Sequence, residues 1–442
     1  MKKAIALLIA LALALGLLPA ALAEAESAPA LPQVGEVIHG FEVVELRDYP
    51  LMDATIVRFT HRQTGAELYY IANDDTNRAF DLTFFTEAID NTGLPHVFEH
   101  ATIQGSEKYP GEQMFFNLNY QTYNTFLNAM TGQWYTSYPI ASLSEAQLLK
   151  LAEFYTDACF NPIIMENERI FRTEAWRYRL ESADAPLTIE GTVYSEMLGA
   201  LTLQRQALIN LERAAFPGSM AGNVSGGDPE YIPDMTWQAL KDYHDKYYHP
   251  SNCAAYLYGQ FDNYKAFLQL LDGYFSTYER REYVREDAGY TPITAPVVQS
   301  LPFPVEAGAS TEHASTVLYA FVCPGLKQIL ADELVLDTMT DLFIANASNL
   351  QQRLQEAIPY GSFAAYIEMN GPEDAIMFMA NNVDPGDTET FKIVGSVEAD
   401  PMNGRLSDES LIGKALMGRR MGDEISYHAP MGLITCRITN IE

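Results

Sequence analysis

The chain reads GLPHVFEH over residues 93–100, and this octapeptide decides how the surrounding fold is organised. Pro95 suits the first turn of a helix, where its missing N–H costs no hydrogen bond. On such a helix His96 and His100 stand about one turn apart on the same face. Two imidazole nitrogens placed in this way can bind one Zn²⁺ at about 2.0–2.1 Å. The stretch therefore predicts a helix over 95–103 that presents two metal ligands.

Glu99 follows His96 on the same side of this predicted helix. A carboxylate beside the metal, rather than bound to it, can take a proton from an attacking water and act as general base. A catalytic zinc normally has three protein ligands and one open position, so a third ligand must come from elsewhere. The competing interpretation is a helix with two unrelated histidines and a surface glutamate, which the presence of only 8 histidines in the chain disfavours.

The composition limits the class of protein. The 442 residues favour two or three domains, and 48% hydrophobic and 12% aromatic residues argue against disorder. The formal net charge of −30 makes a nucleic-acid-binding surface improbable over most of the chain. The same charge serves solubility, or it presents a negative surface that attracts cationic peptides.

The N-terminus is typical of a secretory signal. Lys2 and Lys3 precede an apolar run over residues 4–18, and Ala21-Leu22-Ala23 supplies the small residues that signal peptidase reads. A retained anchor is the alternative, but the run is short for a span of about 20 residues. We expect cleavage after Ala23, no stable membrane span in the mature protein, and a secreted or cell-envelope, extracytoplasmic location.

The order of predicted elements indicates an α+β fold rather than a doubly wound one. Strand-like patterns come first and helical patterns follow. The predicted strands are 41–46, 54–59, 67–72 and 80–85, with a closing strand at 254–259. The predicted helices are 95–103, 142–159, 165–177 and 192–203. Ser142 and Glu145 fit a capping box at the start of the second helix. A second α+β unit begins with a strand at 315–321 and a helix at 331–344.

The four cysteines are Cys159, Cys253, Cys323 and Cys436, and no two form a CxxC pair. A metal cluster or redox motif is therefore not predicted. Export would permit a disulfide, although the spacing selects no pair, and buried free thiols are the simpler expectation.

Four stretches together resemble the insulinase/pitrilysin family of zinc metallopeptidases, most closely its presequence-protease branch. Residues 93–110, GLPHVFEHATIQGSEKYP, resemble the family's active-site helix. Residues 124–139 contain a segment similar to its substrate-binding strand, and 192–197 are similar to the segment that supplies the third zinc ligand. Residues 247–252 resemble the passage out of its first helical layer. The resemblance covers about residues 36–383.

The resemblance implies the remaining site residues. It assigns Glu196 as the third zinc ligand, with Glu190 as the rival and a solvated surface carboxylate as the alternative for either. It places Asn128 and Ala129 on an edge strand that pairs with the substrate backbone, which gives affinity for extended peptides. The implied activity is zinc-dependent hydrolysis of short or unfolded peptides, with Glu99 as general base. The alternative is a catalytically weak or inactive subunit or binding module that keeps the fold.

Family members of this branch carry four domains that enclose the substrate, whereas this chain resembles one complete domain and part of a second. The later half of the relatives, which supplies an Arg and a Tyr that hold substrate, has no recognised counterpart here. Three alternatives stay open: a second chain completes the chamber, the site works open, or the chain is truncated.

The last residues resemble the C-terminal domain of Gre-type transcription elongation factors. The similarity runs through 391–395, 398–401, 404–407, 410–418 and 422–424. It implies a small β-rich module that docks on RNA polymerase, which requires a cytoplasmic chain and so conflicts with a signal peptide. A genuine fusion and two reading frames joined near residue 383 are both open.

The expected domains are 1–23 signal peptide, 24–36 flexible lead-in, 37–262 catalytic metallopeptidase domain, 263–310 linker region, 311–384 partial second metallopeptidase-like domain and 385–442 Gre-like module.

Overall fold

A computed structural model describes the chain in twelve stretches. They are residues 30–111, 113–283, 291–300, 308, 310–323, 325, 330–369, 374–384, 392–394, 405–420, 423–429 and 432–438. The predicted signal peptide, residues 1–23, lies outside them. In these described stretches no helix combines the length and the apolar character that crossing a membrane needs.

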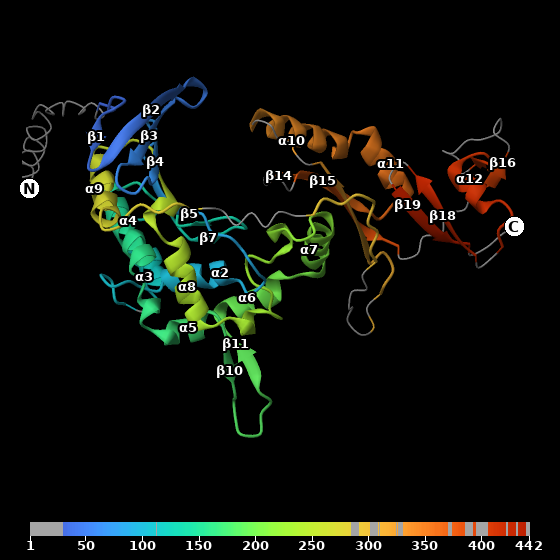
Figure 1. The fold of residues 1–442 in the computed structure, drawn as a ribbon, viewed down its shortest axis with the longest axis horizontal. Helices are drawn as coiled ribbons and strands as arrows, with labels where there is room; N and C mark the ends of the chain where they lie inside the picture. Colours follow the sequence, from blue (N-terminus) through green and yellow to red (C-terminus); the bar gives the residue numbers. More distant parts are fainter. Residues whose placement is uncertain are drawn as a thin grey trace, which may run out of the picture. The chain divides into compact units, whose positions relative to one another are not determined.

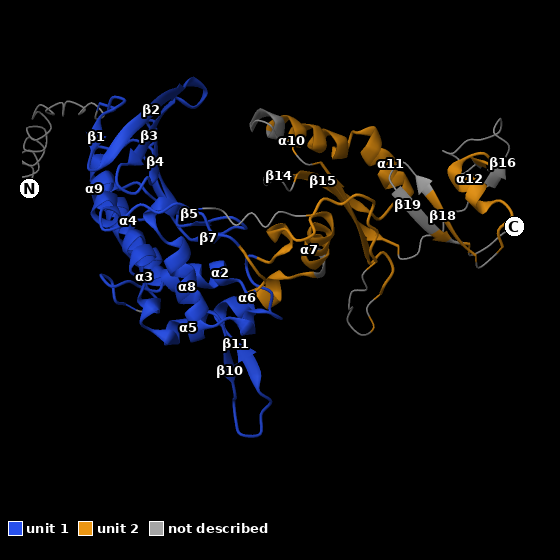
Figure 2. Ribbon diagram, viewed as in Figure 1, with its two compact units in different colours: residues 1–87, 92–195, 225–284 blue, residues 88–91, 196–224, 285–442 orange. Residues whose placement is uncertain are grey.

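The chain divides into two compact units (Figure 2). Unit 1 comprises residues 1–87, 92–195 and 225–284, and unit 2 comprises 88–91, 196–224 and 285–442. The division passes through one continuous helix, α6 (Thr192–Ala200). It differs from the expected domain ends, because residues 263–284 belong to unit 1 rather than to a linker.

Unit 1 is built on a ten-stranded mixed sheet (Figure 1). Its main path runs β1-β2-β3-β4-β12-β5-β8-β7, and β9 pairs with both β5 and β6. The strands are β1 (Val37–Ile38), β2 (Phe41–Tyr49), β3 (Ala54–His61), β4 (Glu67–Ala72), β5 (Arg78–Phe84), β6 (Phe126–Leu127), β7 (Met130–Thr131), β8 (Thr136–Ser137), β9 (Ile140–Ser142) and β12 (Cys253–Tyr258). All five predicted strands are confirmed. β12 lies parallel to β4 and antiparallel to β5, which closes the centre of the sheet.

The core of unit 1 follows from the period-2 pattern of its strands. In β5 the side chains of Phe80, Leu82 and Phe84 are fully buried, while the residues between them are partly exposed on the other face. Phe80 packs against Phe267 of α9 (Lys265–Phe275), with ring centroids 6.1 Å apart. Phe84 packs edge-on against Phe160 of α4 (Glu145–Phe160). Because α9 buries its apolar face here, the stretch expected to be a linker contributes to the core.

The capping box predicted at Ser142 is wrong. α4 begins three residues later, and its N-cap is Ser144, whose side chain accepts a hydrogen bond from the Gln147 amide. Ser142 ends β9 and donates its hydroxyl to the Tyr123 carbonyl. Glu145 accepts from the backbone N–H groups of residues 262 and 263, so it joins α4 to the chain ahead of α9 instead of closing a box.

The remaining helices of unit 1 are short. They are α2 (Leu94–Thr102), α3 (Met114–Gln121), α5 (Glu168–Glu174) and α8 (Trp237–Tyr247). The helix predicted over 165–177 is therefore only partly confirmed, because the Asn167 side chain caps α5 and β10 (Arg177–Arg179) follows at once. The helix predicted over 192–203 ends at Ala200, because Thr202 already caps the next helix.

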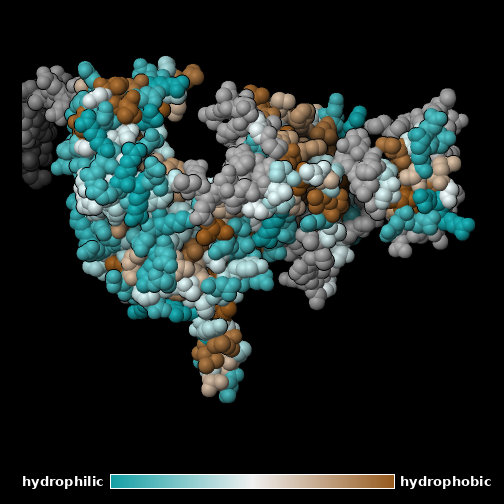
Figure 3. Space-filling model, viewed as in Figure 1, coloured by the Kyte–Doolittle hydropathy of each residue, from teal (hydrophilic) through white to brown (hydrophobic). Residues whose placement is uncertain are grey.

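β10 and β11 (Thr188–Glu190) form a hairpin that projects from unit 1 (Figure 1). Figure 3 shows hydrophobic side chains on it, and Leu180 and Leu187 are 56% and 61% exposed. The hairpin connects α5 to α6.

Unit 2 contains a three-stranded antiparallel sheet in the order β13-β15-β14. Its elements are α7 (Leu203–Ala215), β13 (Ser315–Val322), α10 (Leu330–Ile344), α11 (Asn349–Ala357), β14 (Ser362–Met369) and β15 (Asp374–Val383). Ala215 and Phe216 at the end of α7 pack on Ala375 and Met377 of β15. The predicted strand at 315–321 and helix at 331–344 are confirmed, with the ends shifted by one residue.

The last part of unit 2 consists of short elements. They are β16 (Lys392–Val394), β17 (Arg405–Ser407), α12 (Leu411–Leu416), β18 (Glu424–Ala429) and β19 (Gly432–Arg437). β16 and β17 are parallel, and β18 and β19 form an antiparallel pair. All four cysteines of the chain lie in described residues and are free thiols.

Candidate functional site

α2 carries the GLPHVFEH sequence as a buried helix. It begins after Gly93, which is the N-cap residue at φ 75°, and Pro95 occupies its first turn. His96 and Glu99 are 8% and 6% exposed, whereas His100 is partly exposed. The hydrophobic residues of the helix face the interior: Phe98 packs against the rings of Tyr243 and His244 of α8. The helix is therefore held rigidly with its polar residues directed to one side.

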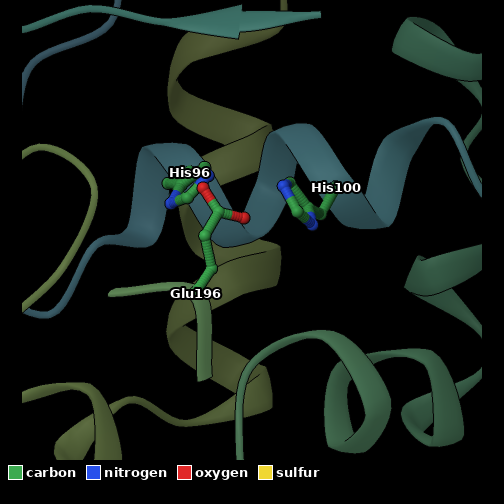
Figure 4. A group of neighbouring side chains, drawn as sticks. All are labelled: His96, His100 and Glu196. Carbon is green, nitrogen blue, oxygen red and sulfur yellow. The ribbon is translucent and has the colours of Figure 1, made fainter. Parts of the chain in front are cut away.

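Three of the predicted site residues come together around a single point. One ligand atom each from His96, His100 and Glu196 lies within 4.8 Å of the other two. Figure 4 shows the Glu196 carboxylate reaching from α6 toward the imidazoles on α2. Glu190, the rival, lies on β11 and pairs with Arg177 at 3.0 Å. The geometry therefore favours Glu196 over Glu190 as the third carboxylate of the group.

Hydrogen bonds orient both imidazoles. His96 Nδ1 is 2.9 Å from the Gly226 carbonyl oxygen, so Nδ1 must donate and the ring lone pair is on Nε2. His100 Nδ1 lies 3.4 Å from the Glu174 carboxylate, which favours the same tautomer. Glu174 also accepts from the Gln104 side chain at 3.1 Å and is 5% exposed. Acceptors placed behind ligating histidines fix the ring orientation and raise the basicity of the ligand nitrogen.

A close contact between two glycines brings the Gly226 carbonyl to His96. A Cβ added to Gly93 would lie 2.5 Å from the Gly227 Cα, closer than real Cβ atoms approach. Both residues also have positive φ, at 75° and 95°, which disfavours other side chains. The two glycines thus allow residues 226 and 227 to lie directly against the start of α2.

Glu99 is anchored by a residue of the sheet. The Thr131 hydroxyl donates to Glu99 Oε2 at 2.5 Å. Thr131 is in β7, at one end of the main path of the sheet. The carboxylate is therefore positioned by its own helix and by the neighbouring strand.

A cavity of about 340 Å³ in unit 1 opens beside Glu99 and His100. Aromatic and aliphatic side chains line it together with polar ones, among them Asn128. Asn128 and Ala129 lie between β6 and β7, and the Tyr155 hydroxyl donates to the Asn128 carbonyl. Asn128 is exposed, whereas Ala129 is 8% exposed and does not line the cavity. Of the two predicted substrate-binding residues, only Asn128 lines the cavity.

The donor set fits zinc chemically. Two neutral imidazoles and one carboxylate are the ligands of several catalytic zinc sites, which keep a fourth position for water or substrate. Oxygen-only cations such as Mg²⁺ would not favour two imidazoles. His96, His100 and Glu196 would hold the ion.

Three contributors to the site had no signal in the sequence. Glu174 is one of 58 acidic residues, and nothing in its surroundings along the chain marks it. Gly226 acts through its carbonyl, which carries no side-chain pattern. Thr131 lies within the segment similar to the family's substrate-binding strand, but no role followed from its residue type.

We expect Glu174→Gln to weaken the site without removing it. An amide can still contact Gln104, but it loses the negative charge behind His100 Nδ1. Losing such a supporting contact typically costs about 10–100-fold in metal affinity or activity. Zinc titration against a competing chelator measures this loss. Glu168→Gln, on the exposed side of the same helix, is the control and should leave zinc affinity unchanged.

Comparisons with known proteins match two regions of the chain to family models and the chain to several relatives. Residues 234–391 match the Peptidase M16 inactive domain, and residues 379–442 match the C-terminal domain of transcription elongation factors GreA/GreB. The chain is 37% identical over 254 residues to the mitochondrial presequence protease of Mus musculus, covering 57% of this chain and 24% of that protein. It is 29% identical over 404 residues to protein HypA of Clostridium perfringens, covering 90% of this chain and 41% of that protein. The chain thus spans less than half the length of these relatives.

The fold agrees with the sequence comparisons. The crystal structure of pitrilysin matches 77% of this chain and 35% of its own chain, with a TM-score of 0.54 and 16% identity. The mixed α+β architecture is therefore that of M16 peptidase structures over about three quarters of the chain.

Proposed function

Because this chain belongs to the M16 (pitrilysin/insulinase) peptidase family and is related to presequence proteases, we propose that it is a zinc-dependent endopeptidase. Its substrates would be short or unfolded peptides. The observation that carries the proposal is the group formed by His96, His100 and Glu196, with Glu99 on the same helix as the two histidines. A non-catalytic member would have no need for all four residues.

The position of each site residue suggests its role in peptide hydrolysis. When bound, zinc polarises the scissile carbonyl and lowers the pKa of water to about 7. Glu99 takes the proton from the attacking water and passes it to the leaving amine. The Thr131 hydroxyl holds the Glu99 carboxylate in place, and the Gly226 carbonyl and Glu174 carboxylate keep the imidazoles aligned.

The edge of the sheet supports the choice of peptides as substrates. β6 pairs with β9 and β7 pairs with β8, so both short strands sit at the margin of the sheet, and Thr131 of β7 contacts Glu99. An extended peptide can add to such an edge through main-chain hydrogen bonds, which require no particular side chains. Asn128 borders both this edge and the cavity.

Removing the metal tests the proposal directly. The purified protein should cleave a library of unstructured peptides, lose activity with a zinc chelator, and regain it when one equivalent of Zn²⁺ is added. Mass spectrometry of the products identifies internal cleavage and separates endopeptidase from exopeptidase activity. Cleavage that persists unchanged in the metal-free protein would rule out the mechanism.

A second candidate function rests on the GreA/GreB match at residues 379–442. A chain retained in the cytoplasm could dock on RNA polymerase through this region. Of the two functions, we prefer the peptidase. We propose that it acts outside the cytoplasm and that a second chain completes its chamber. Sequencing of the native locus across residue 383 would show whether the two regions share one frame.

A further inference from the structure

A row of side chains crosses the open face of the unit 1 sheet, opposite the face covered by α4 and α9. The strand register places Arg58 beside Tyr69, Tyr69 beside Tyr256, and Tyr256 beside Asp81. The row therefore passes through β3, β4, β12 and β5. None of these side chains has a part in the proposed hydrolysis.

The two tyrosines form a flat aromatic platform. The rings of Tyr69 and Tyr256 are stacked, with centroids 5.5 Å apart and planes inclined by 15°. The Tyr69 hydroxyl donates to Glu67 at 2.5 Å, which increases the electron density of that ring. Tyr256 is 36% exposed, so a ligand can reach the platform. Such a surface attracts a guanidinium or ammonium group through cation–π contact.

Asp81 borders the platform, and no ion pair to it is found among the residues that the structure describes. Its carboxylate accepts hydrogen bonds from the hydroxyls of Thr83 and Ser137, the second at 2.6 Å. Within the described stretches no lysine or arginine pairs with it, whereas Arg58 farther along the row already pairs with Glu45 and Glu67. Burial raises the pKa of the Asp81 carboxyl, because desolvation disfavours its charged form. A cation placed over Tyr256 would stabilise that charged form.

The row is also within reach of a peptide bound at the sheet edge. β5 pairs with β8, and β8 pairs with β7. Strands are spaced about 4.8 Å apart, so a peptide strand added beyond β7 lies three spacings, or about 14 Å, from Asp81 on β5. About four extended residues flanking that peptide strand cover this distance.

We propose that Asp81, with the stacked pair Tyr69 and Tyr256, is a subsite for the side chain of an arginine or lysine in a bound peptide. The inference rests on the proposed peptide-binding function and adds a side-chain preference to it. The net charge of −30 attracts cationic peptides at long range. The subsite would add direct contacts that select them once they are bound.

Binding to the Glu99→Gln protein tests this subsite without catalysis. The probes are a fluorescent unstructured peptide with a single arginine and the same peptide with neutral, isosteric citrulline, both at 0.15 M salt. We expect the arginine peptide to bind about tenfold more tightly. Adding Asp81→Asn should bring the two affinities together. Asp48→Asn is the matched control, because it removes an exposed carboxylate from the same sheet, and it should preserve the preference.

The results separate three cases. If Asp81→Asn keeps the arginine preference, or if Asp48→Asn removes it equally, the subsite is wrong and only general charge attraction operates. If neither peptide binds, the peptide-binding function fails together with the subsite. Tyr256→Leu, at a partly exposed position, should also reduce the preference, so the outcome does not depend on one variant folding.

Discussion

Glu99→Gln should retain zinc and lose peptide cleavage. Glutamine has the same shape as glutamate, so the buried position can accept it and the Thr131 hydroxyl still finds an oxygen acceptor. The amide cannot take a proton from water. Loss of a general base costs about 10²–10⁴-fold in rate. This is the largest effect on turnover that we expect from a change of so few atoms.

The measurement combines kcat on a quenched fluorescent peptide with the zinc content of the same preparation. Glu107→Gln is the matched control, since it makes the same change at an exposed residue shortly after α2. The control should behave as wild type. Equal cleavage by wild type and Glu99→Gln would show that Glu99 is not the base. Loss of zinc from Glu99→Gln would instead place the residue among the ligands.

The local pattern of the sequence predicts most of unit 1 because its signals are short-range. In β5 the apolar residues Phe80, Leu82 and Phe84 alternate directly with polar ones, and α2 combines a proline in its first turn with a buried apolar side. The errors occur where distant contacts decide. Glu145 looked like a capping residue, but it is held by the backbone at residues 262 and 263. No pattern around Glu145 could show that partner.

The domain boundaries were also hard to predict, because they depend on contacts between residues that are distant in the sequence. Residues 263–284 precede a proline-rich stretch and read as a linker, yet Phe267 and Phe275 of α9 are fully buried in unit 1. The surface that receives α9 is formed partly by strands far earlier in the chain, where Phe80 contacts Phe267 and Phe41 contacts Phe275.

Some residues of the candidate site could be predicted from local spacing, and others could not. His96, Glu99 and His100 lie on one helix, so their spacing alone predicts their shared face. Glu196 comes from another helix, and it was assigned only through the family resemblance. Glu174 and Gly226 act from behind the histidines, through contacts that depend on the fold. A motif thus identifies what one helix presents, whereas the supporting contacts require the structure.

Glu196→Ala should remove most of the affinity for zinc. The mutation takes one of three donors from the group, and this loss should exceed the roughly 10–100-fold that an outer contact costs. Cleavage at limiting zinc should fall with it. Competition with a chromophoric chelator gives the affinity, and metal analysis after dialysis gives the stoichiometry, which should fall below one ion per chain.

Glu190→Ala is the control that decides between the two carboxylates. Glu190 pairs with Arg177 at 3.0 Å and with Arg179 at 3.5 Å on the projecting hairpin, so its removal should alter only exposed ion pairs. Such pairs contribute about 0–1 kcal/mol to stability. The two variants should therefore differ strongly in zinc affinity and little in unfolding temperature. The opposite pattern, with zinc lost from Glu190→Ala and retained by Glu196→Ala, would mean that the hairpin rather than α6 supplies the third ligand.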